Sequence, residues 1–513
     1  MATFLQDLSP VNKGIVSCLV LYTIYWIVQY SIKLRRQDAI IRKKGCKPVR
    51  KYPHRDPVLG LDIFLENAKL LKTGGFWDRT RERYLSLNTW TFSQLLMGDR
   101  IINTTEPENI KAILATQFHE FELPPRRKDT FQPVLGHGIF TTDGKEWEAS
   151  RALLRPNFVR NQIADLNTFD HHISALVSHI PNDGSTFDLQ SLFFMLTMDS
   201  ATEFLFGTST AVLDGGIASE RGERFAEAFT YATERIGTYS RLGKLASLLP
   251  DKHFNDSVAY VHEYVHGYVQ KAVDLHKKAS LSQKFDEKDS SRYVFLEHLA
   301  KAGYSEKKIQ DELLNILLAG RDTTASLLSY LFYFLARRPD VFSKLRAEIM
   351  ALGKDLPTFE EIKELKYLQY CLNETLRLYP VVPGNSRTAI VDTTLPVGGG
   401  ADGKSPVFVK AGQQVNYQVY VMHRRKDLYG EDAMEFKPER WEKLRPSWQF
   451  LPFNGGPRIC IGQQFALTEA SFTTIRILQA FKSIEARDNS PLKELMTLTS
   501  AVRGGVHVGM TPA

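Results

Sequence analysis

The sequence predicts a mainly α-helical protein with small β-sheets and a single N-terminal transmembrane helix. Three observations support this class. Residues 14–32 form an uncharged apolar run, residues 305–338 form a long proline-free stretch with a wide apolar face, and the strand-like segments are short. Apolar residues at a spacing of three to four indicate a helix, whereas short runs between turn residues indicate strands. No Pro/Gly/Ser-rich linker divides the 513-residue chain after residue 60, so we expect an anchor at 1–35 and one large domain at 36–513.

The N-terminal apolar run reads GIVSCLVLYTIYWIVQYSI from Gly14 to Ile32. Its length is close to the ~20 apolar residues that a helix needs to cross a bilayer core. The alternative is a cleaved signal peptide, but the preceding residues are barely basic and no small-residue cleavage site follows. Six basic residues come soon after the run, against one before it, Lys13. This asymmetry predicts a retained, single-pass anchor with the rest of the protein in the cytosol.

The composition of the chain limits the kinds of molecule that it can bind and the compartment in which it resides. The chain has 65 basic and 58 acidic residues, a formal charge of +7, without a strongly basic cluster. This balance suits a membrane surface or an acidic protein partner, and we expect no nucleic-acid binding. The four cysteines, Cys18, Cys46, Cys371 and Cys460, lack the spacing of a zinc site or a disulfide framework. A reducing compartment is therefore expected.

The stretch from Ser305 to about Arg338 is predicted to be one long helix that Ser305 caps and Pro339 ends. The segment Ala319-Gly320-Arg321-Asp322-Thr323-Thr324 interrupts its apolar pattern. Gly320 costs about 1 kcal/mol relative to alanine in a helix interior, and such broken local rules often mark a functional site. The alternative is a close helix crossing at Gly320, with the threonines bonding back to the preceding turn.

A second helix is predicted from about Phe359 to Leu378, ended by Tyr379-Pro380. Glu374 and Arg377 lie on one face of it, at a spacing of three. Most such pairs are solvated and contribute under about 1 kcal/mol. A later segment, Phe436 to Trp441, contains a further arginine, Arg440.

The glycine-rich stretch from Gly398 to Ser405 formally satisfies the phosphate-loop pattern G-x-x-x-x-G-K-[ST]. That pattern binds phosphate only when a helix opens directly after it. Here Pro406-Val407-Phe408-Val409 and Gln414 to Tyr417 follow, which indicates strand, turn and strand. We interpret the stretch as a hairpin tip, and a membrane-tethered P-loop NTPase is kept only as a remote alternative.

The most informative segment runs from Phe453 to Gly462 and reads FNGGPRICIG. Its glycines allow the backbone to approach a bulky group closely, and Cys460 comes just before an expected helix, whose N-terminus favours a thiolate. A lone cysteine is usually a buried apolar residue. Five residues at fixed spacing make that interpretation improbable here: Phe453, Gly456, Arg458, Cys460 and Gly462.

This segment resembles the haem-binding loop of the cytochrome P450 family, and the resemblance covers about residues 45–505. It implies the cytochrome P450 fold, with haem b (iron protoporphyrin IX) as cofactor and Cys460 as the thiolate ligand of the iron. By the same resemblance, Ala319 and Gly320 leave room for O2, Thr323 steadies it by hydrogen bonding, and Asp322 helps to supply protons.

Further motifs match the same family. Glu374, Arg377 and Arg440 resemble its buried salt-bridge triad, so that loss of Glu374 or Arg377 should abolish haem incorporation. The motif WxxxR, Trp147 and Arg151, resembles the pair that faces the porphyrin edge. We expect Arg458, Arg151 and Arg387 to contact the haem propionates, because arginine binds carboxylates in a bidentate manner.

The resemblance implies a reductase-dependent monooxygenase. It would take electrons from NADPH through a separate NADPH-cytochrome reductase, and the membrane would be that of the endoplasmic reticulum. The reductase would dock around the Cys460 loop, where Arg458 could meet acidic side chains. A narrower resemblance, in FNGGPRICIGQQFALTEASF, is to fungal and yeast alkane and fatty-acid hydroxylases. It implies a long-chain alkane or fatty acid as the hydrophobic substrate; the alternative is tailoring oxidation of a fungal secondary metabolite of polyketide type.

The substrate pocket is predicted to be lined by five segments: residues 118–139, residues 235–254, Leu318 with Ala319, Val381 to Pro383, and residues 497–502. The run Arg126, Arg127 and Lys128 could anchor a carboxylate, although a solvated surface run is the interpretation that we favour.

Overall fold

The computed structural model describes the whole chain except residues 1–9, 159–165, 216, 243–248 and 283–294. Helices make up most of the described chain, as predicted. Their bounds are α2 Pro10–Lys44, α3 Leu61–Thr73, α4 Phe76–Ser86, α5 Pro107–Lys111, α6 Pro125–Leu135, α7 Gly144–Leu154, α9 Leu166–Ser178, α10 Leu189–Phe206, α11 Ile217–Leu242, α12 Lys252–Ser282, α13 Phe295–Lys301, α14 Glu306–Leu335, α15 Pro339–Met350, α16 Phe359–Glu364, α17 Lys366–Leu378, α18 Val419–Met422, α19 Lys426–Tyr429 and α20 Gln463–Ala480.

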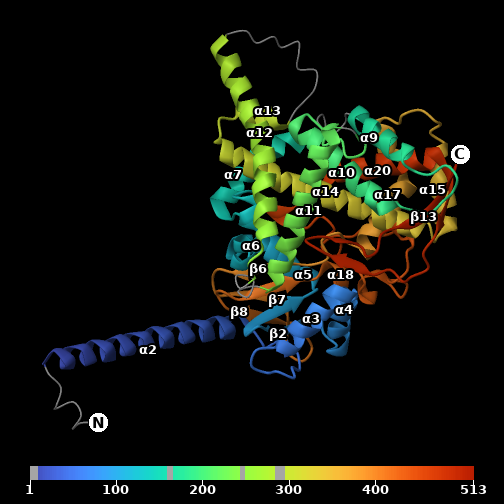
Figure 1. Cartoon of the computed structure of the whole chain (residues 1–513). Coiled ribbons are helices and arrows are strands. Elements are labelled where there is room, and N and C mark those ends of the chain that lie inside the picture. The colour runs from blue at the N-terminus through green and yellow to red at the C-terminus, as the bar shows by residue number, and fades with distance from the viewer. Residues whose placement is uncertain (1–9, 159–165, 216, 243–248, 283–294) are drawn as a thin grey trace.

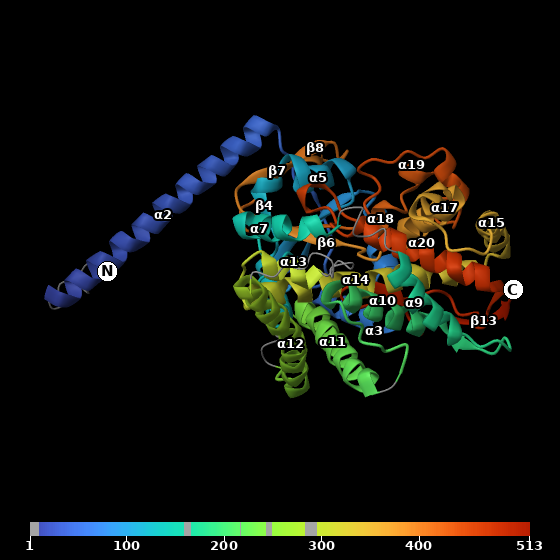
Figure 2. The same cartoon turned by 90° about the horizontal axis from the view of Figure 1, so that it is seen from above.

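The β-structure is confined to small sheets. The strands are β1 Arg50–Lys51, β2 Thr91–Leu96, β3 Asp99–Thr104, β4 Phe121–Glu122, β5 Phe187–Asp188, β6 Asn385–Ala389, β7 Thr393–Gly399, β8 Ser405–Val409, β9 Gln414–Tyr417, β10 Phe481–Ala486, β11 Glu494–Met496, β12 Ser500–Val502 and β13 His507–Pro512. The largest sheet has six strands in the order β1-β2-β3-β9-β6-β4, and β7 pairs with β8. In both cartoon views the β7–β8 hairpin lies near the end of α2 (Figures 1 and 2).

Helix α14 lies at the centre of the helical part. Its C-terminal half packs with α10, α17 and α20 in one apolar core, and its N-terminal half packs with α11, α12 and α13 in a second core. The predicted cap is confirmed, because the Ser305 hydroxyl accepts a hydrogen bond from the Lys308 amide at 3.2 Å. A helix that is apolar around most of its circumference must be buried on all sides. Its residues can therefore be positioned from several neighbouring elements.

The predicted single helix from Phe359 to Leu378 is wrong, because the chain breaks at Leu365 into α16 and α17. A capping box between Thr358 and Glu361 starts α16. The amides of Tyr367 and Leu368, at the start of α17, each donate to the Glu348 carboxylate at 2.9 Å. This carboxylate, from the neighbouring helix α15, satisfies amides that would otherwise lack partners at a helix start.

The glycine-rich stretch is the turn between β7 and β8, with Gly399 paired to Ser405 across it. No helix follows it, so the prediction of a hairpin tip is confirmed. The second predicted strand, β9, does not pair with β8 but joins β3 and β6 in the large sheet.

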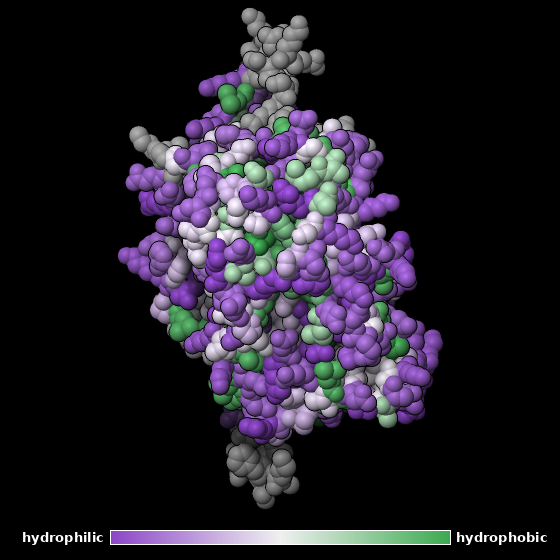
Figure 3. Space-filling view, turned by 90° about the vertical axis from the view of Figure 1, so that its right-hand side faces the viewer, coloured by the Kyte–Doolittle hydropathy of each residue, from purple (hydrophilic) through white to green (hydrophobic). Residues whose placement is uncertain are grey.

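Helix α2 extends away from the rest of the molecule (Figure 1). Between Pro10 and Lys44 it is one continuous helix, and it is long and apolar enough to cross a membrane. The predicted boundary at residue 35 falls inside it. Two residues later the Gln37 amide donates to the Asp392 carboxylate at 3.0 Å, a contact to the segment between β6 and β7. Figure 3 shows that the face of the molecule seen from the right-hand side of Figure 1 is mostly hydrophilic.

Candidate active site

A cavity of about 360 Å³ lies between α14 and the Cys460 loop. Residues from α6, α7, α10, α14, α20 and β6 also line it, so it brings together segments that are far apart in the sequence. In the described chain, the charged residues of the lining are all arginines: Arg127, Arg151, Arg387 and Arg458. The remaining lining residues are apolar or small and neutral, except for Cys460 and a few hydroxyl and amide side chains.

The Cys460 loop is a tight turn that directs the cysteine into this cavity. The Cys460 amide donates to the Phe453 carbonyl at 2.9 Å, and α20 begins at Gln463, just after Gly462. Gly456 has a φ of +68°, and a Cβ there would lie 1.8 Å from the Leu114 carbonyl oxygen. A larger residue would therefore displace the loop from η1, the π-helical turn Ala112–Thr116. At Gly462, by contrast, an added Cβ would make only an ordinary contact with Phe158, at 3.6 Å.

The Cys460 thiol is accessible from the cavity but is enclosed by protein on its other sides. Burial raises the pKa of this thiol, whereas the Gly462 amide and the Arg151 guanidinium lower it. The expected helix N-terminus is present, but on its own it does not make the sulfur a thiolate. A coordinated metal cation deprotonates a thiol outright.

The interrupted segment of α14 crosses the cavity. Ala319, Gly320 and Thr323 line it, whereas Asp322 is buried to one side. Among the described residues, a Cβ at Gly320 would meet only the Ala201 side chain of α10, at 3.5 Å, which is an ordinary contact, so the packing of α10 against α14 does not require a glycine there. The alternative also predicted threonines that bond back to the preceding turn. Thr323 does so, because its hydroxyl donates to the Ala319 carbonyl at 2.6 Å. Burial raises the pKa of the Asp322 carboxyl, and the neighbouring Arg321 lowers it.

Trp147 and Arg151 both line the cavity from α7, with the Arg151 guanidinium 5.9 Å from the Trp147 ring. Arg151 donates to the Ile459 carbonyl at 2.9 Å, which ties α7 to the Cys460 loop. Arg387 reaches the cavity from β6 and is only 3% exposed. Helix α7, with Trp147 and Arg151, and strand β6, with Arg387, thus meet at the cavity beside the Cys460 loop.

Arg458 also lines the cavity, but it is not on an outer face. It forms an ion pair with Asp143 at 2.6 Å, and its side chain is 9% exposed. The guanidinium lies 4.3 Å from the Trp147 ring. The predicted place of Arg458 on a reductase-docking surface is therefore wrong, because the loop turns this side chain inward.

Arg127 is the main residue of the site that the sequence interpretation misplaced. We favoured a solvated surface run at 126–128, but Arg127 lines the cavity and donates to the Asn385 side chain at 3.2 Å. Among the described residues its Nε has no hydrogen-bond partner, and burial, with the nearby Arg387, lowers the pKa of Arg127 to about 10. A buried polar atom without a partner is costly and points to a group that would complete it.

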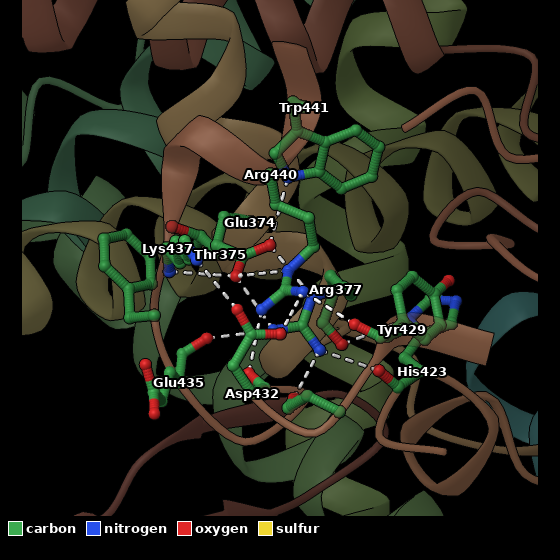
Figure 4. A network of polar contacts seen from close by, with 12 residues as sticks. Glu374, Thr375, Arg377, His423, Tyr429, Asp432, Glu435, Lys437, Arg440 and Trp441 are labelled. Atoms are coloured by element: carbon green, nitrogen blue, oxygen red, sulfur yellow. Dashed lines mark hydrogen bonds and ion pairs between the residues drawn. The ribbon is translucent and has the colours of Figure 1, made fainter. Parts of the chain in front are cut away.

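The triad Glu374, Arg377 and Arg440 is assembled as predicted (Figure 4). Arg377 donates to both Glu374 oxygens, at 2.8 and 2.9 Å, and neither side chain is exposed. Arg440 reaches Glu374 at 3.4 Å, and the Trp441 indole donates to it at 3.0 Å. Arg377 also donates to the carbonyls of His423, Ala433 and Glu435. This network fixes the segment that leads to the Cys460 loop.

The predicted pocket segments are partly correct. Residues from 123–139, Leu318 with Ala319, Val381 with Val382, and Leu498 with Thr499 line the cavity. From the segment 235–254, none of the residues that the structure describes does so, and 243–248 lie outside the described residues. The described part of this segment instead forms the end of α11 and the start of α12, which carry the apolar core behind the cavity.

Glu469 is a buried carboxyl that no sequence motif singled out. It lies on α20, is 1% exposed and accepts a hydrogen bond from the Ser200 hydroxyl. Burial raises the pKa of Glu469 to about 7, although the Ser200 and Thr324 hydroxyls lower it to a smaller extent. The nearby Thr324 lines the cavity.

The residues around the cavity fit the haem group that the sequence resemblance implies. A single thiol faces the cavity from one side, and the α14 segment faces it from the other. Among the described residues, Arg127, Arg151 and Arg387 have no carboxylate partner within ion-pair distance, although burial is costly for unpaired cations. Two propionates would offset two of these three positive charges.

Comparisons with known proteins agree with this geometry. The family model described as Cytochrome P450 matches residues 72–505. A cytochrome P450 monooxygenase of Aspergillus japonicus, himC, is 47% identical over 93% of this chain and 86% of its own length. Another, fsdH of Fusarium heterosporum, is 42% identical over 97% of this chain and 89% of its own length. Cytochrome P450 52A5 of Candida maltosa is 46% identical over 92% of each chain.

Proposed function

The chain belongs to the cytochrome P450 family, and we propose that it is a membrane-anchored monooxygenase that hydroxylates long aliphatic chains such as alkanes and fatty acids. Enzymes of this family contain haem b and receive electrons from NAD(P)H through a reductase. The resemblance to yeast alkane and fatty-acid hydroxylases supports the substrate class.

The apolar lining of the cavity carries this proposal. The apolar residues that line the cavity include Phe131, Phe140, Ile316, Leu318, Val381, Val382 and Leu498. Such a surface binds an alkyl chain through burial of apolar area, at about 25 cal/mol per Å². The arginines gather around Asn385 and the Cys460 loop, where we assign them to the propionates rather than to a substrate carboxylate.

The reaction would be R–H + O2 + NADPH + H⁺ → R–OH + H2O + NADP⁺. The haem, when bound, supplies the centre at which O2 is reduced and one oxygen atom is transferred. Cys460 would be its thiolate ligand, and Trp147 with Arg127, Arg151, Arg387 and Arg458 would hold its edge. Phe453, Gly456 and Gly462 would shape the loop beneath it.

Residues of the α14 segment would leave space for O2, donate a hydrogen bond to it and transfer protons. Ala319 and Gly320 leave space beside the helix, since only Ala201 approaches Gly320. The Thr323 hydroxyl, which lines the cavity, would turn from the Ala319 carbonyl to hydrogen-bond the oxygen. Asp322 would pass protons, a contribution typically worth a factor of about 10² to 10⁴.

We further propose that α2 anchors the protein in the endoplasmic reticulum membrane with residues 36–513 in the cytosol. The apolar run at 14–32 and the basic residues after it support this orientation. The reductase would dock on the outer side of the Cys460 loop, at side chains other than Arg458.

A second candidate function is tailoring oxidation in a fungal secondary-metabolite pathway. It is favoured by one observation: himC and fsdH, at 47% and 42% identity, are as similar to the chain as the yeast 52A proteins are. An apolar cavity would also accept an alkyl position on a larger apolar scaffold.

The two candidates are separated by a product test. Membranes that contain the full-length chain and a reductase are incubated with NADPH and dodecane, hexadecane, dodecanoic acid or hexadecanoic acid. Mass spectrometry should find a hydroxylated product from at least one of them, and none with Cys460→Ser. The control Cys46→Ser, which alters a cysteine outside the cavity, should retain the product. Turnover of a polyketide-type substrate alone would support the tailoring function and contradict the first.

A further inference from the structure

Arg321 connects three helices at the rim of the active site. It follows Gly320 in α14 and is 9% exposed. One terminal nitrogen donates to the Asp322 carboxylate at 2.9 Å, and the other donates to the Thr230 hydroxyl of α11 at 2.8 Å. The guanidinium also lies 5.2 Å from the ring of Phe194 in α10.

The ion pair between Arg321 and Asp322 is unusual, because adjacent residues of a helix do not face each other. Both side chains must bend toward one another for it to form. The Arg321 carbonyl accepts a further hydrogen bond from the Thr197 hydroxyl of α10, at 2.7 Å. The remaining nitrogen, Nε, has no hydrogen-bond partner in the described part of the chain. The orientation of Asp322 therefore depends on Arg321, and that of Arg321 depends on Thr230.

Helix α11 also supports the wall of the cavity. It packs against α6, which carries the cavity residues Arg127 and Phe131. The Thr130 and Ser240 hydroxyls form a hydrogen bond of 2.9 Å between these two helices. One turn after Thr230, burial raises the pKa of the Glu234 carboxyl, while Arg321 lowers it and Asp322 raises it. A second acceptor for the guanidinium is thus within electrostatic range on α11.

We propose that Arg321 is a positioning residue that orients the Asp322 carboxylate and couples it, through Thr230, to the packing of α11 on the cavity. The inference rests on the proposed function, because it needs Asp322 to pass protons to the cavity. A bidentate guanidinium can bind both acceptors at once, whereas a lysine ammonium acts as a single point charge. Arg321 thereby links α11, which packs beside the cavity, to Asp322, which would supply the protons.

The test uses two substitutions on α11, far from the reacting atoms. Thr230→Val removes the acceptor but keeps the shape of the side chain, and Thr230→Ser keeps the hydroxyl. The first measurement is the infrared stretch of carbon monoxide bound to the reduced protein, which responds to nearby charge and needs no substrate. We expect Thr230→Val and Arg321→Lys to shift this band in the same direction as Asp322→Asn, and Thr230→Ser to leave it in place.

The second measurement is the share of NADPH electrons recovered in hydroxylated dodecanoic acid rather than in hydrogen peroxide. We expect Thr230→Val to lower this share about fivefold, less than the factor of about 10² typical of losing the proton donor itself. Thr230→Ser should retain it. A purely structural role would lower only the thermal midpoint. An unshifted band, or a shifted band with an unchanged product share, would overturn the proposal.

Failure of the proposed function would be recognised separately. A protein without a carbon monoxide complex would contradict the function itself. A protein that binds carbon monoxide but hydroxylates none of the four alkanes and fatty acids would contradict only the substrate class. In that case the ratio of NADPH to O2 consumed replaces the product share, because reduction of O2 to water takes two NADPH and reduction to peroxide takes one. An equal ratio in the wild type and in Thr230→Val would then overturn the role of Arg321.

Discussion

The Glu374 carboxylate receives hydrogen bonds from two side-chain nitrogens of Arg377, from the Trp441 indole and from the Lys437 amide. The Glu374 side chain has no exposed surface, so a lost partner would leave its carboxylate buried away from bulk water. Asp432 balances the second arginine, and Arg440 with Lys437 lowers the pKa of Asp432 to about 2. The network is therefore balanced in charge as well as in hydrogen bonds.

Glu374→Gln should lower the free energy of unfolding by about 3–5 kcal/mol, because it leaves the Arg377 charge buried without a counter-charge. We also expect the purified protein to contain little haem. Glu431→Gln is the control, since its ion pair with Lys426 is on the surface and should contribute under about 1 kcal/mol. Equal losses in denaturant unfolding for the two variants would contradict a buried role for Glu374.

The raised pKa of Glu469 predicts that the stability of the folded protein depends on pH. This pKa is about 7 in the folded protein against 4.5 in the unfolded chain, so the folded state binds the proton more tightly. The contribution of Glu469 is therefore most favourable below pH 4.5, declines as the pH rises from 4.5 to about 7, and stays low above it.

Relative to the wild type, Glu469→Gln should gain stability over this pH range, by up to about 3 kcal/mol at pH 8. Denaturant unfolding of both proteins between pH 5 and 8 measures the difference. Glu485→Gln, at an exposed position, serves as the control and should give a difference that does not change with pH. A flat difference for Glu469→Gln as well would contradict the raised pKa.

At the scale of the elements, the loop between α6 and α7 is held onto α14 by side chains rather than by a regular ladder. The amides of His137, Ile139 and Phe140 donate to Asp311, Glu312 and Asn315. Gly136 and Gly138 leave room for these side chains, since a Cβ at either position would lie within 2.3 Å of one of them. The loop places Ile139 and Phe140 in the cavity wall.

Gly138→Ala should disorder this loop, because the new methyl group would lie 2.3 Å from the Asn315 amide nitrogen. We expect faster hydrogen exchange at residues 137–141 and a weaker spectral response to dodecanoic acid. Gly267→Ala is the matched control. It lies within α12 with nothing within 4 Å of its Cβ, and should stabilise the protein by up to about 1 kcal/mol. Hydrogen exchange at residues 137–141 that is as slow in Gly138→Ala as in the wild type would show that contacts with α14 do not hold this loop.

The elements also show how far the sequence could predict the site. The Cys460 loop, the α14 segment and the triad were recognisable because their residue types and spacing are themselves the requirement of the geometry. Arg127 was not, because a run of basic residues in sequence does not indicate which one turns inward. Nor could the break at Leu365 be predicted, since it depends on a carboxylate from α15. The inward turn of Arg458 likewise depends on Asp143, which is distant in sequence.

At the scale of the whole molecule, α2 and the remaining chain are physically distinct. The residues of α2 from Gly14 to Ile32 expose apolar side chains, whereas the face in Figure 3 is largely hydrophilic. In the part of the chain that the structure describes, α2 contacts the rest of the molecule near its C-terminal end, through Gln37 and through packing against β8, so the fold should not depend on the apolar run.

Deletion of residues 1–32 should therefore release much of the protein from membranes while leaving its carbon monoxide spectrum unchanged. Fractionation of cells by centrifugation, followed by spectroscopy of both fractions, measures this. Deletion of 1–44 removes the Gln37 contact as well and should lower the thermal midpoint further. Loss of the chromophore in the shorter deletion would show that the membrane helix is required for folding.

The proposed coordination of iron by Cys460 is tested most directly by the carbon monoxide difference spectrum of the purified, reduced protein. We expect the shifted Soret band of a haem–thiolate protein for the wild type and for Cys46→Ser. The same band should be absent from Cys460→Ser. A colourless wild-type protein, or a Cys460→Ser protein with an unaltered band, would contradict the proposed coordination.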